Sequence, residues 1–369
     1  MDYRVIIIET DKMVLKELSN DLKQTPSFTV LSTYDDVNAA IGQSSMYNPN
    51  LFLLDIDNPA ALNALPAFVD IFPNSMILGM MSDWNVQSAY EALQGGAFGC
   101  ILKSYKPAEI IDSINLYKRR GQAKPPRIIT FFSPKGRSGR TTLASILALT
   151  VAKKSGETVS LIDADLQFGD LPMFFDVEPK HTVVDAVHDV KWLTPTSFDQ
   201  YFYKLKENVW LLSSPDRPEY AELVDAERLV EVISMAGNMF RYLFIDLPAG
   251  FNPLSIALSR FANINFVMAM FNTGLELGHM KRSLELFQER STRKKHNNYP
   301  IFTRVNPCDE LKKAELEYQL GYHIEEIIPN EYNMISVANS GRIAKGLPED
   351  TLLMKKIDTL AEKIITGKI

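Results

Sequence analysis

The fold of this chain is decided by one stretch of sequence, Phe131-Phe132-Ser133-Pro134-Lys135-Gly136-Arg137-Ser138-Gly139-Arg140-Thr141-Thr142. An apolar run, 127–130, precedes it, and a second apolar run, 143–148, follows it. This order of strand, glycine-bearing loop and helix start is the layout in which backbone N–H groups and a helix dipole hold phosphate. The lysine that usually stands before the two hydroxyls is replaced by Arg140, and an additional lysine, Lys135, stands at the front of the loop. The stretch therefore predicts a nucleotide site whose capacity for hydrolysis is in question.

Length and composition indicate a globular protein of two domains. A chain of 369 residues can bury two cores, and its 46% hydrophobic and 23% charged content is typical of soluble proteins. The net charge of −6 argues against a general affinity for nucleic acid. We find no signal peptide and no apolar run near the roughly 20 residues that a membrane span needs. We therefore expect a cytoplasmic protein, with Cys100 and Cys308 as buried, reduced side chains.

Two alternating series of strands and helices lie on either side of a basic segment that ends in Pro125-Pro126. Such a pair cannot continue a helix, so the segment is interpreted as a linker. Continuous apolar runs between helical patterns are typical of parallel sheets that are covered on both faces. We expect an α/β protein with a first domain at 1–118, a linker at 119–126 and a second domain at 127–369.

Ligand chemistry in open α/β sheets gathers at the carboxyl ends of the strands. In the first domain these ends carry Glu9, Asp55 and Lys103. The sequences around them, 53–59 and 95–103, resemble the receiver domain of two-component signalling, which has a flavodoxin-like fold. The resemblance implies that Asp55 is the phosphoacceptor, that Lys103 neutralises the phosphoryl group, and that Glu9 belongs to an acidic pair that holds Mg²⁺.

The receiver chemistry is incomplete in this sequence. The second member of the acidic pair is Thr10, the position of the sensing hydroxyl is Met81, and the proline expected after the lysine is Ser104. We therefore expect an inactive receiver that serves as a docking surface. The alternative is a switch that is controlled by phosphorylation of Asp55.

Two apolar strands of the second domain end in aspartates. The run 158–162 leads into Asp163 and Asp165, and the run 242–245 leads into Asp246 and a Pro/Gly turn. Beside a bound ATP–Mg²⁺, Thr141 offers a direct hydroxyl ligand, and Asp163 and Asp246 can hold coordinated waters. Asp165 is free to orient an attacking water or to accept its proton.

A late strand closes with Thr303-Arg304-Val305-Asn306-Pro307. The side-chain amide of Asn306 has the donor and the acceptor that suit the edge of an adenine. This asparagine is therefore the candidate for recognition of the base.

Taken together, the motifs of the second domain resemble the MinD/ParA group of P-loop ATPases. A receiver-like domain ahead of such an ATPase is the layout of the TadZ/CpaE pilus-assembly proteins, and the segments 213–221 and 328–331 also resemble that branch. The resemblance implies a doubly wound, mostly parallel P-loop NTPase sheet after the receiver-like domain, with ATP and Mg²⁺ as cofactors. It further implies that Lys135 reaches the nucleotide of a second subunit in an ATP-sandwiched homodimer. Partners would be pilus and secretion machinery bound through the receiver-like domain, at the cell pole or the inner-membrane face.

Three substitutions in the loop depart from the family pattern. Pro134 fills the opening glycine position, Arg137 replaces a second glycine, and Arg140 replaces the lysine. Arginine keeps the charge, but its planar fork is bulkier than an ammonium, and a small misplacement can lower a phosphoryl-transfer rate about 100-fold. We therefore expect ATP binding with slow or no turnover. The expected catalytic residues are Asp165, Lys135 and Arg140, the metal ligands are Thr141, Asp163 and Asp246, and the nucleotide contacts are Pro134, Lys135, Gly136, Arg137, Ser138, Gly139, Arg140, Thr141, Thr142, Asn306 and Pro329.

Two other functions stay open at this point. One is an active partition or positioning ATPase that cycles on DNA or membrane, and the other is a protein in which the nucleotide is purely structural. The amphipathic stretch 352–365 bears on the first, because some MinD-type relatives end in a membrane-seeking helix. Here Asp358 and Glu362 interrupt its basic face, so we expect a helix that packs on the core of the second domain.

Overall fold

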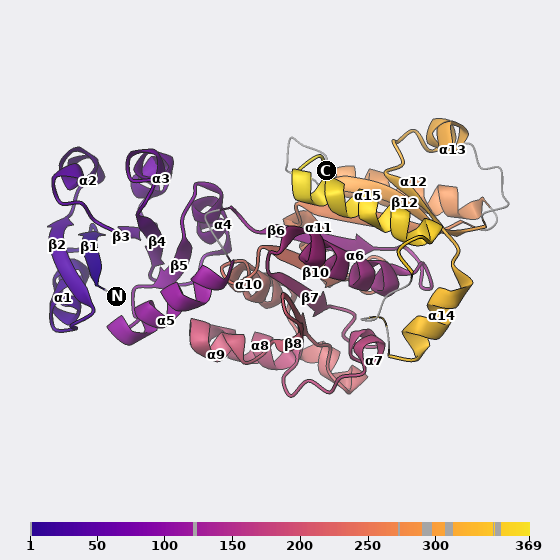
Figure 1. The fold of residues 1–369 in the computed structure, drawn as a ribbon, viewed down its shortest axis with the longest axis horizontal. Helices are drawn as coiled ribbons and strands as arrows, with labels where there is room; N and C mark the ends of the chain where they lie inside the picture. The colour runs from indigo at the N-terminus through magenta and orange to yellow at the C-terminus, as the bar shows by residue number, and fades with distance from the viewer. Residues whose placement is uncertain are drawn as a thin grey trace. The chain divides into compact units, whose positions relative to one another are not determined.

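The computed structural model describes residues 2–120, 124–271, 274–289, 297–306, 313–341, 343 and 348–369, and the chain divides into two compact units (Figure 1). The first unit comprises Met1–Pro126 with Leu193–Ser197 and Ile233–Arg241; the second comprises Arg127–Trp192, Phe198–Val232 and Tyr242–Ile369. The predictions for Cys308 and for residues 121–123 of the linker lie outside the described residues.

The first unit is built on a parallel sheet of five strands with the order β2-β1-β3-β4-β5. This is the flavodoxin-like order, as the sequence predicted. The strands are β1 (Tyr3–Ile8), β2 (Phe28–Tyr34), β3 (Leu51–Asp55), β4 (Met76–Met81) and β5 (Gly99–Leu102). The helices are α1 (Lys12–Lys23), α2 (Val37–Gln43), α3 (Pro59–Ile71), α4 (Val86–Gln94) and α5 (Pro107–Tyr117), with short 3-10 turns at Ser44–Met46 and Lys118–Arg120.

Short polar side chains fix where the helices of the first unit begin. Asp11, Asp36, Asn58 and Asn85 each precede a helix and accept a hydrogen bond from a backbone N–H of its first turn. Such caps satisfy donors that have no partner inside the helix. The loops between strands and helices are therefore held close to the carboxyl ends of the strands.

The second unit is built on a sheet of eight strands with the order β13-β12-β11-β6-β10-β7-β9-β8. The predicted mostly parallel sheet is confirmed; only the pairing of β8 with β9 is antiparallel, with a register shift between Lys204 and Lys206. The strands are β6 (Arg127–Phe132), β7 (Val159–Asp163), β8 (Tyr203–Lys206), β9 (Val209–Leu212), β10 (Tyr242–Asp246), β11 (Ile264–Met270), β12 (Asn298–Val305) and β13 (Glu326–Pro329).

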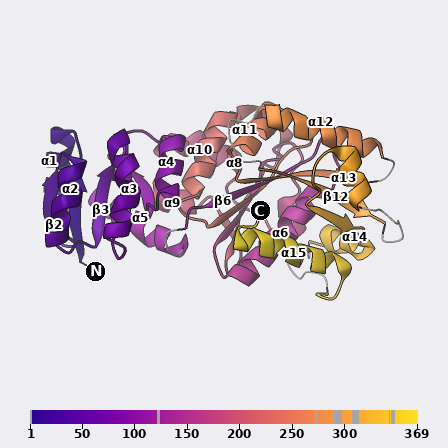
Figure 2. The same cartoon turned by 90° about the horizontal axis from the view of Figure 1, so that it is seen from above.

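Helices cover both faces of this sheet. Figure 2 shows α11 and α12 along one face and α6 and α15 along the other. The helices of the unit are α6 (Arg140–Ser155), α7 (Leu171–Phe175), α8 (Val183–Asp189), α11 (Pro253–Phe261), α12 (Leu275–Glu289), α13 (Lys313–Leu320), α14 (Tyr332–Asn339) and α15 (Leu352–Thr366), with 3-10 turns at Val190–Trp192 and Pro218–Leu223. Two further helices, α9 (Pro195–Asp199) and α10 (Ala226–Ala236), contribute residues to both units.

The register of the central strands brings the acidic motifs together. β10 lies between β6 and β7, and Asp246 pairs with Phe131 on one side and with Asp163 on the other. All three strands are parallel, so their carboxyl ends meet at one edge of the sheet. Both aspartates therefore lie beside the loop that follows β6.

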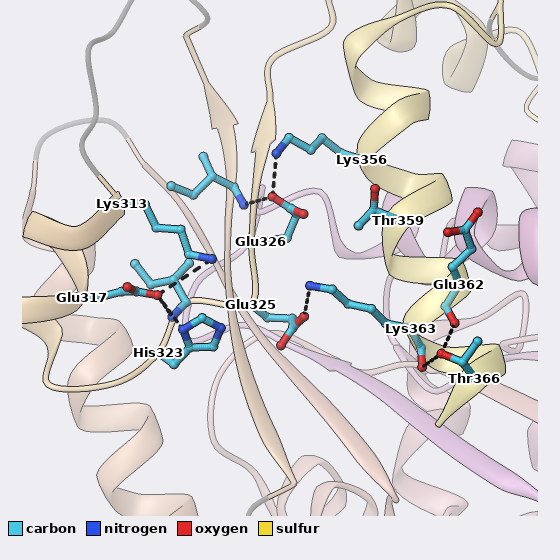
Figure 3. Close-up of polar contacts among 12 residues, drawn as sticks. Lys313, Glu317, His323, Glu325, Glu326, Lys356, Thr359, Glu362, Lys363 and Thr366 are labelled. Carbon is cyan, nitrogen blue, oxygen red and sulfur yellow. Dashed lines mark hydrogen bonds and ion pairs between the residues drawn. The ribbon is translucent and has the colours of Figure 1, made fainter. Parts of the chain in front are cut away.

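The C-terminal helix α15 packs on the core of the second unit, as expected from its sequence. Its buried apolar residues join the cluster that includes α6 and the central strands; they are Leu353, Ile357, Leu360, Ala361 and Ile364. Two lysines on the helix reach the end of the sheet (Figure 3): Lys356 Nζ lies 2.9 Å from Glu326 Oε1, and Lys363 Nζ lies 2.5 Å from Glu325 Oε1. Among the described residues, no helix is long and apolar enough to cross a membrane.

The Lys363–Glu325 pair is expected to stabilise the attachment of α15. The Glu325 side chain is 6% exposed, so Lys363→Met leaves a buried carboxylate without its partner. We expect a loss of about 1–3 kcal/mol in the free energy of unfolding of this unit. The matched control is Lys153→Met, which breaks an exposed pair with Glu349 and should leave the melting temperature nearly unchanged, because solvent screens that pair. Thermal denaturation of both variants measures the difference, and equal melting temperatures would contradict this role for the pair.

Candidate functional site

The loop between β6 and α6 has the geometry of an anion site. Gly139 directly precedes α6 with φ +77°, the left-handed region that glycine adopts readily. A glycine has no side chain to cap the helix, so the first N–H groups of α6 face the loop without a side-chain acceptor. Such N–H groups and the positive end of the helix dipole favour phosphate. The folded loop therefore keeps the arrangement that the sequence predicted.

The hydroxyl and the acids expected to hold a metal lie together. Thr141 Oγ1 donates to Asp246 Oδ2 at 2.5 Å, and Asp163 is the neighbour of Asp246 across β7 and β10. Asp246 Oδ1 has no hydrogen-bond partner although the residue is 1% exposed. An unpartnered buried carboxylate oxygen next to a hydroxyl is a suitable place for a cation.

The donor set fits Mg²⁺ bound together with a phosphate. No group of three or more His, Cys, Asp and Glu side chains in the described part of the chain could hold a metal ion by itself. Mg²⁺ usually takes one or two carboxylates, several waters and phosphate oxygens instead of an all-protein cage. Thr141 and Asp246, together with Asp163 on the neighbouring strand, provide such an incomplete set of ligands, which phosphate and water oxygens would complete.

Burial changes the acidity of both aspartates. It raises the pKa of Asp163 well above the usual value, and the nearby charge of Asp246 adds to the effect. Burial also raises the pKa of Asp246 to about 6, although Arg140 and the Thr141 hydroxyl oppose it. Two carboxylates that resist ionisation side by side would be relieved by a divalent cation between or beside them.

Asp163 also anchors the loop that follows β7. Its Oδ1 accepts from the N–H of Asp165 at 3.2 Å, and its Oδ2 accepts from the N–H of Leu171 at 3.2 Å and from Ser214 Oγ at 3.1 Å. A side chain at Gly169 would place a carbon 2.4 Å from Asp163 Oδ2, so only glycine fits there. The contacts position Asp165 at the mouth of the site. The sequence alone predicts no role for Ser214, although the segment 213–221 resembles the TadZ/CpaE branch.

Arg140 lies buried against the acidic residues. It is 8% exposed, its Nη2 lies 3.7 Å from Asp165 Oδ2, and its Nη1 has no hydrogen-bond partner. The guanidinium therefore contacts the acid that was expected to orient water, and it keeps one buried donor available for another acceptor.

A cavity of about 160 Å³ opens beside the loop. Its polar lining comes from the loop and from the ends of β12 and β13, namely Gly139, Thr142, Thr303, Arg304, Asn330 and Glu331. The rest is mainly apolar and includes Leu143, Ile146, Phe174, Ile328, Pro329, Met334, Leu353 and Ile357. An apolar pocket with a few polar groups at its rim suits a nucleobase.

Not every predicted contact lines this cavity. Pro329 does, but Asn306 is exposed and is not among the lining residues. Thr303 and Asn330 are among the polar side chains that do line it. Among the remaining loop residues, Lys135, Gly136 and Arg137 are exposed, Ser138 is buried and Pro134 is intermediate, and their contacts with a nucleotide stay a prediction.

In the first unit, Lys103 forms ion pairs with three carboxylates at the carboxyl ends of the strands. Its Nζ lies 2.8 Å from Asp55 Oδ1, 2.9 Å from Glu9 Oε2 and 3.2 Å from Asp57 Oδ2. Burial opposes the charge of Lys103, but hydrogen bonds to Asp55 and Glu9 outweigh it and raise the pKa of the ammonium. Asp57 was not predicted, although its position two residues after Asp55 could have suggested it.

Hydroxyl groups complete this cluster. Thr10 Oγ1 donates to Asp55 Oδ2 at 2.8 Å, and Ser82 donates to Asp57 Oδ2 through both its N–H and its Oγ, each at 2.8 Å. Burial of Asp55 is outweighed by its bonds from Lys103 and Thr10, so its pKa lies below the usual value. Both oxygens of the predicted phosphoacceptor are therefore occupied by groups of the protein.

The raised pKa of Asp246 predicts a pH-dependent stability. Below its unfolded pKa of 3.8 the carboxyl is protonated in both states. Between that pH and about 6 the unfolded state ionises while the buried carboxyl keeps its proton, so the folded state loses stability as the pH rises through this window. Asp246→Asn removes this cost, so at pH 7.5 we expect the variant to be about 1–3 kcal/mol more stable, and the gain should vanish between pH 6 and pH 4.

Urea unfolding at several pH values measures this difference. Asp165→Asn, which removes a nearby charge that also raises the pKa of Asp246, is the control and should give a smaller gain than Asp246→Asn. An Asp246→Asn variant that is less stable than the unaltered chain at pH 7.5 would contradict the prediction.

No family model matches this chain. An uncharacterized ATP-binding protein of Methanocaldococcus jannaschii is 33% identical over 129 residues, which cover 34% of this chain and 46% of that protein, so the chain spans about half the length of this relative. The septum site-determining protein MinD of Escherichia coli is 25% identical over 231 residues, 58% of this chain and 82% of MinD.

Solved structures show the same fold. A ParA family ATPase from Chlorobium tepidum has a TM-score of 0.59 and 20% identity, and the match covers 64% of this chain and 98% of the ATPase. MinD from Pyrococcus horikoshii, complexed with Mg-ADP, has a TM-score of 0.56 and 19% identity, with 66% and 98% covered. The chain is therefore similar in sequence to an ATP-binding protein and to MinD, and it shares the fold of the MinD/ParA-type P-loop ATPases.

Proposed function

We propose that this chain is an ATP- and Mg²⁺-binding scaffold protein that dimerises and hydrolyses ATP slowly or not at all. The observation that carries the proposal is the position of Arg140. It stands where a P-loop lysine would follow the phosphates, yet it is buried and lies 3.7 Å from Asp165. The groups that bind a nucleotide are retained, and the group that would orient water is paired with a cation.

The roles of the residues follow from their contacts. The N–H groups of the loop and of the first turn of α6 hold the phosphates, and Arg140 neutralises part of their charge with its unpartnered Nη1. Thr141 and Asp246 hold Mg²⁺, which would neutralise charge on the phosphates. The cavity of about 160 Å³ takes the base. Supporting this, the relatives include ATP-binding proteins and a MinD complexed with Mg-ADP.

Dimerisation is proposed through the same face. Lys135 is exposed, and its ammonium has no hydrogen-bond or ion-pair partner among the described residues. An unpaired cation at the front of the loop is available for a phosphate bound by a second copy. Light scattering with and without ATP–Mg²⁺, with Lys135→Ala as the variant, tests whether the nucleotide drives association.

The cellular role is proposed from resemblance to the TadZ/CpaE layout. The first unit would act as an inactive receiver that docks pilus-assembly or secretion proteins, and the dimer would localise that machinery at the cell pole. The closed ion-pair cluster of Lys103, Glu9, Asp55 and Asp57 supports a docking role over a phosphorylation switch.

An active positioning ATPase that cycles on DNA or membrane is the second candidate. Similarity to MinD of Escherichia coli favours it, together with the retained Thr141, Asp163, Asp165 and Asp246. The net charge of −6 argues against cycling on DNA. The burial of the apolar face of α15 argues against binding of that helix to a membrane. A steady-state ATPase assay separates the two candidates.

We expect Arg140→Lys to increase ATP turnover, by up to about 100-fold. A lysine is a compact charge that can follow the phosphates, and it would release Asp165 from the guanidinium. The assay compares the unaltered chain, Arg140→Lys, and the double variant Arg140→Lys with Thr141→Ala, which should lose the gain because Mg²⁺ loses a ligand. Turnover of the unaltered chain at rates typical of active P-loop enzymes, or no gain in Arg140→Lys, would contradict the proposed restraint by Arg140.

We expect no stoichiometric phosphorylation of Asp55 by a small phosphodonor with Mg²⁺. Lys103 and Thr10 occupy both carboxylate oxygens, and the protein offers no second acid at position 10 for the metal. Intact mass spectrometry measures the outcome, with Asp55→Asn as the control. A mass increase of one phosphoryl group that is absent in Asp55→Asn would favour the phosphorylation switch.

A further inference from the structure

The phosphate loop holds an arginine in a backbone conformation that arginine disfavours. Arg137 has φ +66°, in the left-handed region. The other non-glycine residues with positive φ among the described residues are Asn48, Asp176 and Arg304. Asparagine and aspartate tolerate this region better than arginine, whose Cβ crowds the backbone. Glycine would adopt the conformation of residue 137 without strain.

Packing gives no reason for an arginine at this position. Arg137 is exposed, and its guanidinium has no hydrogen-bond or ion-pair partner in the described part of the chain. The space around the loop is open as well, because an added Cβ at Gly136 or Gly139 would meet no atom within 4 Å. A strained residue that contributes nothing to the fold points to a functional contact.

The surroundings of Arg137 specify an anionic ligand. Three cations, Lys135, Arg137 and Arg140, lie within six consecutive residues, and of these only Arg140 forms an ion pair among the described residues, with Asp165. Buried polar atoms in the same loop also have no partner: Ser138 Oγ, in a residue 2% exposed, and Arg140 Nη1, in a residue 8% exposed. A ligand with several negatively charged oxygens would accept hydrogen bonds from these donors. It would also reduce the repulsion between the cations.

We propose a specific role for the side chain of Arg137: its guanidinium binds the terminal phosphates of a nucleoside triphosphate held by its own loop. This inference rests on the proposed nucleotide-binding function. The planar fork of arginine can donate two parallel hydrogen bonds to one phosphate, which a compact ammonium cannot do. Arginine at position 137 strains the backbone of the loop, but it adds a second cation at the phosphates. A glycine would avoid the strain and would provide no charge.

Three variants of the full chain separate the charge from the backbone. Arg137→Gly relieves the strain and removes the charge, Arg137→Asn tolerates positive φ without a charge, and Arg137→Lys keeps a charge without the fork. Asp176→Gly is the control for strain alone, because Asp176 is exposed and has φ +54° outside the phosphate loop. Titration calorimetry with Mg²⁺ and a non-hydrolysable ATP analogue, ADP or adenosine measures binding, and thermal denaturation without nucleotide measures stability.

We expect Arg137→Gly to melt a few degrees higher than the unaltered chain and yet to bind the ATP analogue about 10- to 100-fold more weakly. Arg137→Asn should lose as much affinity, and Arg137→Lys less. The loss should be largest for the ATP analogue, smaller for ADP and absent for adenosine. Asp176→Gly should keep the affinity of the unaltered chain.

Two results would overturn the inference in distinguishable ways. If Arg137→Gly and Arg137→Asn bind the ATP analogue as tightly as the unaltered chain, Arg137 makes no phosphate contact, and the proposed nucleotide function stands. If the unaltered chain binds none of the three compounds, the proposed function and this inference fail together.

Discussion

The alignment of β10 between β6 and β7 is the constraint on which the second unit depends. It places Asp246 between Phe131 and Asp163, so that two acidic strand ends lie directly beside the phosphate loop. The Thr141 hydroxyl then closes the group by its bond to Asp246. A shift of one residue in this register would turn each side chain to the other face of the sheet and would dismantle the site. The apolar cluster around these strands, which includes the stacked rings of Phe131 and Phe244, makes such a shift costly.

Both units place a cation of the protein itself at the position where a bound ligand would act. In the first unit Lys103 lies among three carboxylates, and in the second Arg140 lies beside Asp165. The effect differs because the surroundings differ. The oxygens of Asp55 are occupied by Lys103 and Thr10, whereas Arg140 and Asp246 each keep a buried polar atom without a partner. Asp55 therefore has no unoccupied oxygen, although Glu9 Oε2 in the same cluster has only its ion pair with Lys103. The second cluster keeps two buried polar atoms without a partner.

The parts of this structure that depend on neighbouring residues could be predicted from the sequence. The loop, Asp163, Asp165 and Asp246 all follow apolar strands directly, so their positions at the sheet edge are a local consequence of strand ends. Residues that act across long separations could not be predicted. Ser214 meets Asp163 from 51 positions away, and Ser82 meets Asp57 from 25 positions away. The lining of the cavity could not be predicted either, because the backbone of β12 is irregular there. The pairing register shifts after Phe302, and Arg304 has φ +53°. Thr303 lines the cavity, and Asn306 does not.

The outer strand β8 restricts how copies of this chain can join. A free strand edge invites another strand to extend the sheet, which is a common route to aggregation. Here that edge carries Lys204 and Lys206, and the shift in pairing between them interrupts the straight row of backbone donors and acceptors. Charge and irregular spacing both disfavour the accretion of a further strand. Continuous ribbons of chains that extend the sheet from β8 are thus discouraged.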